Sequence, residues 1–441
     1  MKKILALATA SIFLVGVFPN SASAAGVKAG AACTKAGAKS VSAGVQLTCQ
    51  KSGKKLIWVA SGKLAAPAAP KAPAAFKAQI PISLPVAQNG TITFSNLESR
   101  INDVAQVAYQ KTQDALANSK SAPAINNDVH VGPNTKISVT GGLPRIQEVL
   151  TRLEKIYSGF RQVTNFSILI YNAKDEPWAE KEWESFATAR NYFRGQIKGE
   201  KEVIAGNCRE TLSPGVFSGK IANCGGADSG AIQNKDDAIL TFGQSDSGVS
   251  NDPYIYGGGI VGHEYVHAVQ AAQWIGNPKV YCTEQTNSPD CFRSHYVNNL
   301  LPCWLNEGTA HSIGPMAASD TFADYLKHRN NLPFGMGPTM VTDYSETSLN
   351  KFLYNQVFGD QGCISDGNVY RLGYTVGALA TEMLTAIGGP ESVMALYALA
   401  AEGKDFATAF SSVYGISWQE ASGKISKALA AEYATFGPPP K

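Results

Sequence analysis

Two histidines and a glutamate near the middle of the chain have the residue types and spacing of a metal centre. His263, Glu264 and His267 belong to the stretch HEYVH, and residues four apart lie on one face of a helix. Both imidazoles can therefore point at one cation, while Glu264 stands beside it without being a ligand. Zinc with three protein ligands keeps a position for water and lowers the pKa of that water. The stretch predicts a catalytic zinc site in which Glu264 accepts a proton, and it requires a third ligand.

The residues around this stretch favour a metal site over a chance match. Apolar residues recur at helical spacing through Ile260–Val269, so the histidines are expected on a buried helix. Burying two imidazoles there would cost free energy unless a ligand satisfied them. Further along the chain, the stretch WLNEGTA places Glu307 on a second predicted helix at a workable distance.

The elements that must position these residues indicate an α+β protein. Apolar runs predict strands at Phe166–Tyr171 and Ala238–Phe242, the second of which precedes the helix of His263. Helices are predicted at 97–108, 143–160, 176–192, 260–274, from Pro302 onward, and at 370–387, 391–401, 406–413 and 418–433. We expect loop-rich chain over 118–140 and irregular chain over 193–236.

The chain is expected to contain a leader, a small module, a linker and two lobes. Lys2 and Lys3, an apolar run and Ala22–Ala24 predict a signal peptide and a secreted, extracellular protein. No later segment is long and apolar enough to predict a transmembrane helix. The predicted boundaries are a signal peptide at 1–24, a disulfide-closed basic module at 25–59, an Ala/Pro/Lys linker at 60–88, a lobe with the sheet and the His263 helix at 89–275, and a helical lobe with Glu307 at 276–436.

Charge is distributed unevenly along the chain. Residues 1–86 contain eleven lysines and no acidic residue, whereas residues 87–441 contain 27 basic and 35 acidic residues. The basic segment could bind an anionic surface such as a cell wall, or its lysines could simply keep a small exported module soluble. We expect no nucleic-acid partner.

The eight cysteines of an exported chain are expected to form disulfides. Sequence order favours Cys33–Cys49, Cys208–Cys224, Cys282–Cys291 and Cys303–Cys363, although eight cysteines allow 105 connectivities. A bridge from Cys303, which lies one helical turn before Glu307, would tie that helix to the helical lobe.

The two chemical motifs also resemble a known family. HEYVHAVQ followed by WLNEGTA resembles the gluzincin clan of zinc metallopeptidases. Tyr370–Gly373, Ile387–Gly389, Asp405–Phe410 and Tyr414–Ser417 are similar to the peptidase MA-like branch of that clan. The resemblance covers residues 140–435, and the two motifs are its specific part.

This resemblance implies both a fold and a site. It implies a thermolysin-like lobe with a mixed sheet and the active-site helix, followed by a helical lobe across a cleft. It implies one zinc ion per chain, held by His263, His267 and Glu307, with Glu264 as the general base. In this clan the strand before the active-site helix is commonly the sheet edge on which an extended peptide lies, so Ala238–Phe242 could be that edge or an interior strand.

One position departs from the better-known gluzincins. An aspartate four residues after the glutamate ligand often orients a ligand histidine there, whereas this chain has His311. A structural role for His311 is favoured over a role as a substrate contact or as a donor to the oxyanion. Another group must then orient the ligand.

The clan usually has a tyrosine or histidine that stabilises the oxyanion. Tyr370 is the first candidate because it fits a Y-x-x-G pattern, and Tyr374 is the second; both could instead be core tyrosines. His295 is expected to be a bystander, and His130 and His328 are expected to be exposed.

These observations predict a secreted zinc metallopeptidase, a hydrolase that cleaves peptide or protein substrates with zinc-activated water. The alternative is an exported, cell-wall-associated binding protein that retains a metallopeptidase scaffold. A zinc site that only stabilises the fold is disfavoured, because structural zinc normally has four protein ligands and no fourth is evident.

Overall fold

The computed structural model describes most of the chain. The described residues are 28–42, 45–63, 76–119, 124–190, 192, 194–213, 216–221, 223–232, 236–277, 301–334, 343–355 and 371–436. The predicted signal peptide, the predicted pair Cys282–Cys291, His295 and Tyr370 lie outside them. The chain divides into two units, Met1–Ala74 and Ala75–Lys441, and each is described by itself.

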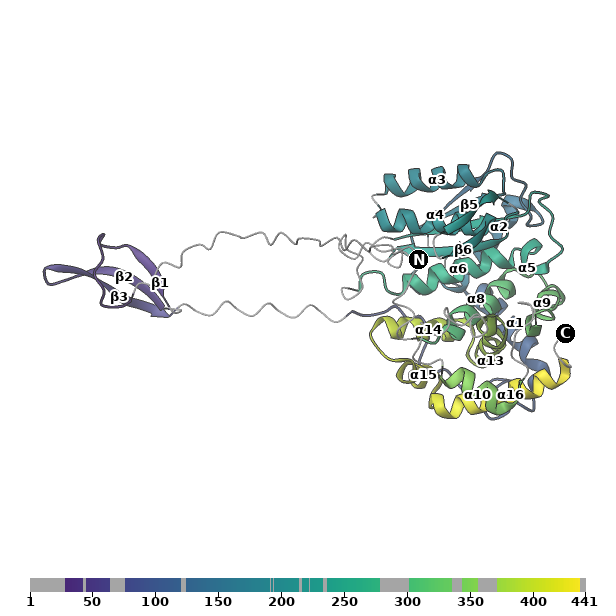
Figure 1. The fold of residues 1–441 in the computed structure, drawn as a ribbon. Helices are drawn as coiled ribbons and strands as arrows, with labels where there is room; N and C mark the ends of the chain where they lie inside the picture. The colour runs from purple at the N-terminus through teal and green to yellow at the C-terminus, as the bar shows by residue number, and fades with distance from the viewer. Residues whose placement is uncertain are drawn as a thin grey trace, which may run out of the picture. The chain divides into compact units, whose positions relative to one another are not determined.

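The small unit is a three-stranded antiparallel sheet closed by a disulfide. β1 (Lys39–Ser42), β2 (Val45–Ser52) and β3 (Lys55–Lys63) lie in that order (Figure 1). Cys33 is bonded to Cys49, which confirms the predicted pair. Leu47 is buried beside the disulfide, and a core this small needs such a covalent bond. Because β3 continues to Lys63, the sheet extends beyond the predicted end of the module.

The end of the predicted linker packs against the larger unit. Apolar residues at alternate positions contact the main core: Phe76, Ala78, Ile80, Ile82, Leu84 and Val86. The backbone N–H of Val86 donates to the carbonyl of Val413 at 2.8 Å, and that of Ala78 donates to Glu402 at 3.1 Å. The predicted linker, residues 60–88, is therefore too long at both ends. It was predicted from the Ala, Pro and Lys content, whereas apolar residues at every second position from 76 to 86 indicate an extended segment with one buried face.

The larger unit is built on a four-stranded mixed sheet of order β4-β5-β9-β8. β4 (Asn126–Val131), β5 (Asn165–Tyr171) and β9 (Asp237–Gly243) are parallel, and β8 (Gly226–Ile232) pairs antiparallel with β9. The sequence predicted β5 and β9, which are buried, and missed β4 and β8, which are more exposed. Because β9 is interior, the possibility that it forms the sheet edge is wrong. The edge strand beside it is β8.

Helices cover both faces of this sheet (Figure 1). α3 (Glu176–Ala189) and α4 (Arg194–Cys208) pack on one face, and α6 (Gly259–Ala272) packs on the other beside α2 (Gly142–Ile156). Successive side chains along each strand point to opposite faces of the sheet. Leu169, Tyr171 and Ile239 face α3 and α4, whereas Phe166, Ile168 and Leu240 belong to the core under α6.

Residues 193–236 are more regular than predicted. α4 leads into a hairpin of β6 (Arg209–Ser213) and β7 (Val216–Ile221), and then into β8. The predicted disulfide Cys208–Cys224 is confirmed, and it joins the end of α4 to the residues just before β8. Cys303 is also disulfide-bonded, while Cys363 lies outside the described residues.

The remaining elements in the described part of the larger unit are helices, and the predicted C-terminal helices are confirmed. The elements are α1 (Ile101–Asn118), α5 (Pro253–Tyr256), α8 (Cys303–Ala318), α9 (Phe322–Arg329), η3 (Leu332–Phe334), α10 (Glu346–Asn355), η5 (Gly373–Gly377), α13 (Ala378–Gly388), α14 (Pro390–Ala401), α15 (Phe406–Tyr414) and α16 (Trp418–Phe436). α9 and α10 were not predicted. The fold is thus mixed α and β. Among the described residues, no single helix is long and apolar enough to cross a membrane. One pair of helices, Gly373–Gly388 and Pro390–Ala401, would be long and apolar enough only if taken together, and the pair is bent by 105°.

Glycines bring α6, α8 and η5 into backbone contact. A Cβ on Gly262 of α6 would stand 2.7 Å from the carbonyl oxygen of Gly314 on α8. A Cβ on Gly308 of α8 would stand 2.3 Å from the carbonyl of Gly377 at the end of η5. Any side chain at these positions would force the elements apart, so glycine there fixes how closely the helices that carry the candidate site approach.

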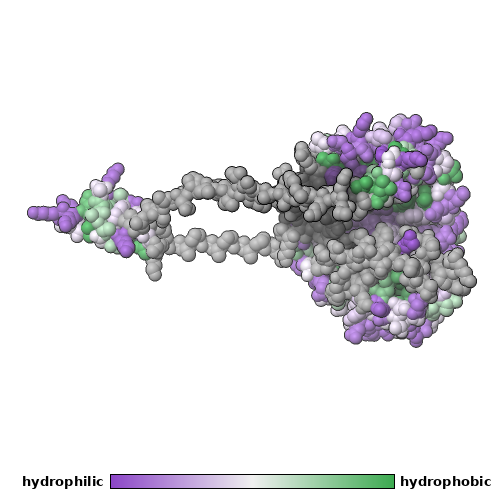
Figure 2. Space-filling view, in the orientation of Figure 1, coloured by the Kyte–Doolittle hydropathy of each residue, from purple (hydrophilic) through white to green (hydrophobic). Residues whose placement is uncertain are grey.

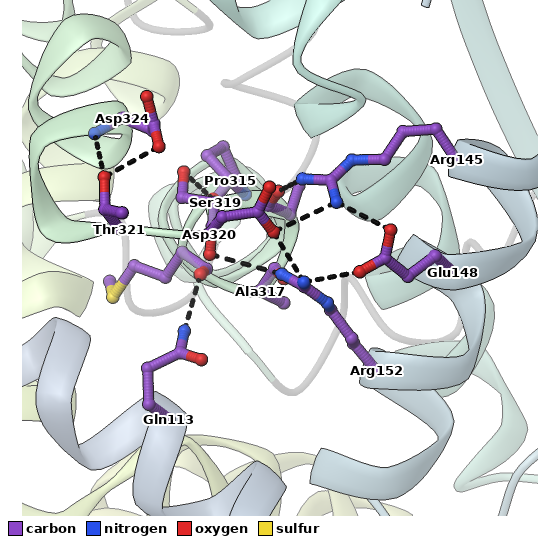
Figure 3. Close-up of polar contacts among 12 residues, drawn as sticks. Gln113, Arg145, Glu148, Arg152, Pro315, Ala317, Ser319, Asp320, Thr321 and Asp324 are labelled. Carbon is purple, nitrogen blue, oxygen red and sulfur yellow. Dashed lines mark hydrogen bonds and ion pairs between the residues drawn. The ribbon is translucent and has the colours of Figure 1, made fainter. Parts of the chain in front are cut away.

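The C-terminus of α8 is held by two arginines of α2 and by Gln113 of α1, which donates to the carbonyl of Met316 at 3.0 Å (Figure 3). Arg152 donates to the carbonyls of Ala317 and Ser319 at 3.3 Å each, and Arg145 donates to the carbonyl of Ala318. Cations at this end of a helix satisfy its last carbonyls and oppose its dipole. Both arginines also donate to Asp320, at 3.0 and 2.5 Å. This cluster fixes the helix that carries Glu307.

Replacing Asp320→Asn should lower the free energy of unfolding by up to about 1 kcal/mol at pH 7, because the carboxylate is half exposed and its ion pairs are screened. Burial raises the pKa of Asp320, but hydrogen bonds from Arg152 and Arg145 outweigh that effect and hold the pKa below its usual value. The stabilisation is therefore complete above the ordinary pKa of about 3.9 and is lost as the pH falls through the lowered one.

The measurement is urea unfolding of the wild type and Asp320→Asn at neutral and acidic pH. Asp103→Asn, which removes an exposed pair with Arg100 at the start of α1, serves as the matched control. A difference for Asp320→Asn that persisted unchanged in acid would show that charge is not its cause.

Candidate metal centre

Three side chains from two helices converge on one point. His263 and His267 lie one turn apart on α6, and Glu307 lies on α8. The Nε2 atoms of the histidines are 3.0 Å apart, and they lie 3.6 and 3.3 Å from Oε2 of Glu307. One potential ligand atom from each residue therefore lies within 4.8 Å of the other two.

These separations fit a bound cation. Ligand atoms 2.0–2.1 Å from a tetrahedral zinc ion would stand about 3.3 Å from one another, which is the middle of the observed range. Oε2 of Glu307 is buried and makes no hydrogen bond in the described structure. A buried carboxylate oxygen facing two ring nitrogens is costly unless a positive charge compensates it. The group formed by His263, His267 and Glu307 could hold a metal ion.

The local sequence explains why the ligands meet. α6 begins after Gly258, whose φ of 87° is left-handed and suits glycine. His263 directly follows Gly262, whose backbone approaches Gly314 of α8 closely. Its side chain therefore lies at the place where α6 and α8 are nearest to each other. Glu307 lies one turn into α8 and is carried by the same helix pair.

Charge in the group is balanced by the site's own residues. Burial lowers the pKa of His263 to about 4. Burial also acts to lower the pKa of His267, but the charge and contact of Glu307 outweigh it and raise that pKa to about 9. Burial acts to raise the pKa of Glu307, and the charge of His267 reverses this and lowers it. A proton thus occupies the group when no metal does, and metal binding would release it.

Glu264 is buried beside the ligands and next to the edge strand. Burial raises the pKa of its carboxyl group to about 8. Its backbone carbonyl accepts a hydrogen bond from Oγ of Ser229 on β8 at 2.9 Å. The strand that ends the described sheet is therefore hydrogen-bonded to the helix at the residue predicted to be the general base.

The outer nitrogens of the two histidines face different groups. Nδ1 of His267 lies 2.8 Å from Oε1 of Gln270, and Nδ1 of His263 lies 3.4 Å from Nδ1 of His311. His311 is buried, and it lies beside His263 at the position where the resemblance led us to expect a carboxylate. Gln270 was not predicted, although its spacing of three from His267 on one helix was a usable signal.

Aromatic rings enclose His263. Tyr374 of η5 stacks on its ring with centroids 5.7 Å apart and an interplanar angle of 3°. Tyr254 of α5 meets its edge at 6.0 Å and stacks on His328 at 5.2 Å. Of the two tyrosine candidates, Tyr374 lies at the site and Tyr370 lies outside the described residues.

The predictions for two remaining histidines need correction. His328 is buried, with Nε2 3.3 Å from the carbonyl oxygen of His311, so its predicted exposure was wrong. A lone histidine in a polar helix gave no sign of the aromatic neighbours that bury it. His130 is only partly exposed and lies between Asp128 and Glu182, at 2.9 and 2.8 Å.

Comparisons with known proteins add no information about this site. No family model, curated protein or solved structure matches the chain.

Proposed function

We propose that the protein is a zinc-dependent peptidase with a thermolysin-like gluzincin fold. The observation that carries the proposal is the convergence of two Nε2 atoms and a carboxylate oxygen at 3.0–3.6 Å beside Glu264. Two neutral imidazoles and one carboxylate form a donor set that suits zinc, and three protein ligands are typical of catalytic zinc. When bound, zinc would supply Lewis-acid activation of water and of the substrate carbonyl.

Glu264 would move the proton in this reaction. A base works best when its pKa lies near the working pH, and burial raises the pKa of Glu264 to about 8. Its carboxylate would accept a proton from the attacking water and return it to the leaving nitrogen. Tyr374, whose ring lies on His263, is the described candidate for a hydroxyl that stabilises the oxyanion.

The sheet offers a place for an extended peptide. β8 pairs with β9 on one side, is the last strand on that side of the described sheet, and contacts α6 through Ser229. A peptide added to this edge would be held by backbone hydrogen bonds, which do not depend on its side chains. An antiparallel edge strand beside the ligand helix, followed by a helical region, supports the proposed fold.

The proposed location is extracellular. The disulfides Cys33–Cys49 and Cys208–Cys224 are typical of proteins from oxidising compartments, and residues 1–24 have the pattern of a signal peptide.

Zinc content is the first measurement. The purified full chain should bind one zinc ion, and Glu307→Gln should reduce bound zinc to a trace because a neutral amide replaces the anionic carboxylate ligand. Glu154→Gln is the control. It changes another buried carboxylate, one that lies on α2 and is not a candidate ligand, and it should leave bound zinc unchanged. The readout is elemental analysis after dialysis, and equal zinc in both variants would contradict the ligand assignment.

Glu264→Gln should separate binding from catalysis. The variant should retain zinc and lose peptide hydrolysis by about 10²–10⁴-fold, because the amide cannot accept the proton. The measurement is cleavage of a peptide library with product identification by mass spectrometry, before and after a chelator and after zinc is restored. Wild-type cleavage by this variant would exclude Glu264 as the base.

A second candidate function is binding to a wall-type polyanion through the small unit. Its described lysines at positions 28, 35, 39, 51, 54 and 55 are all exposed, and no acidic residue lies within 1–86 to neutralise them. Figure 2 shows hydrophilic side chains at the tip and the margins of this unit, around a more hydrophobic middle. Such a surface attracts polyanions through charge that salt screens.

Deleting residues 25–74 should abolish sedimentation of the mature chain with isolated cell walls and leave hydrolysis of small peptides unchanged. Binding by the intact chain should also weaken steeply as salt is raised. Unchanged sedimentation of the truncated chain would assign wall binding to the larger unit.

A further inference from the structure

Gln270 joins a candidate metal ligand to the neighbouring helices. Its side chain is buried on α6, one turn after His267. Oε1 lies 2.8 Å from Nδ1 of His267, and Nε2 lies 3.0 Å from both the carbonyl oxygen of Asn306 and the hydroxyl of Tyr397. The amide thus contacts α6, α8 and α14 at once.

The carbonyl of Asn306 fixes the orientation of this amide. A backbone carbonyl oxygen has only lone pairs, so the Gln270 atom that faces it must be the N–H₂ group. Rotating the amide by half a turn would place two oxygens together in a buried site. Oε1 is therefore the atom that faces His267.

The same reasoning fixes the direction of every bond in the network. Oγ1 of Thr309 donates to the carbonyl of Leu305 at 2.6 Å, so it accepts from Tyr397 at 3.3 Å. The hydroxyl of Tyr397 then uses its proton on Thr309 and accepts from Gln270. The chain of donors runs from His267 through Gln270, Tyr397 and Thr309 to the backbone of α8.

We propose that Gln270 is a positioning residue that fixes the tautomer and ring orientation of His267, with Asn306 and Tyr397 holding its amide in place. An amide oxygen can only accept, so Nδ1 of His267 carries a hydrogen, and the lone pair of the neutral ring is on Nε2, which faces His263 and Glu307. The inference rests on the proposed metal centre and extends it to the group that prepares one ligand.

The same helix provides a matched control. Gln273 is equally buried, and its Nε2 donates to the carbonyls of Arg161 and Val269 at 2.8 Å each. Within the described part of the chain, neither of these hydrogen bonds reaches a candidate ligand. Gln270→Met and Gln273→Met therefore remove the same amide from similar surroundings, and only the first removes the acceptor for His267.

The test is zinc affinity of the full chain, measured by competition with a chromophoric chelator, for the wild type, Gln270→Met and Gln273→Met. Gln270→Met should weaken zinc binding 10- to 100-fold, the usual effect of losing a group that orients a metal-bound histidine. Gln273→Met should bind within about twofold of the wild type, since no ligand contact is lost. Tyr397→Phe should weaken binding less than Gln270→Met, because Asn306 still orients the amide.

A second readout reports the tautomer directly. In the zinc-loaded chain with ¹⁵N-labelled histidine, the spectrum should show a hydrogen on Nδ1 of His267 in the wild type and in Gln273→Met, and the chemical shift of that nitrogen should change in Gln270→Met, which lacks the acceptor. If Gln270→Met does not fold, Tyr397→Phe and the wild-type spectrum decide the question: an Nδ1 without hydrogen in the wild type overturns the proposal. Zinc affinity equal in Gln270→Met and the wild type overturns it too, while the metal centre stands. Failure of the wild type to bind zinc overturns both.

Discussion

The candidate centre depends on how closely α6 can lie against α8. The backbones meet at Gly262 and Gly314, where a Cβ on Gly314 would stand 2.4 Å from the nitrogen of His263. At this separation the first turns of α8 face the middle of α6, so a short carboxylate side chain reaches two imidazoles. A second contact, between Gly308 and Gly377, brings η5 and Tyr374 over the same point. The close packing of these glycines therefore determines whether the two histidines and Glu307 can reach one metal ion.

Sequence reasoning succeeded where a pattern is local. The spacing of His263 and His267, the buried strands β5 and β9, and the apolar periods of the C-terminal helices are all set within one element. It failed where an element depends on partners distant in sequence. β8 is a strand because β9 offers it an edge, and the segment 76–86 is ordered because the core binds its alternate side chains. The role of Gln270 depends on Asn306 and Tyr397, which no local pattern connects to it.

The two candidate histidine ligands have uncharged outer partners. Gln270 faces one, and His311 faces the other, where burial holds the pKa of His311 well below its usual value and keeps the ring neutral. Glu307 would then be the single anionic ligand of a divalent ion. A site with net positive charge polarises bound oxygen atoms more strongly than one with carboxylates behind its histidines. His311, in place of the aspartate that the resemblance predicts, would thus change the electronic character of the proposed centre.

The disulfide between Cys208 and Cys224 has a consequence for when such a protein becomes active. It anchors the chain just before β8, a strand that pairs with β9 and contacts α6 through Ser229. In the reducing interior of a cell the bond would stay open, and the strand proposed to receive substrate would lose its covalent anchor. If the protein is the peptidase proposed above, its binding surface would be completed only after export, which would protect the proteins of the cell that makes it.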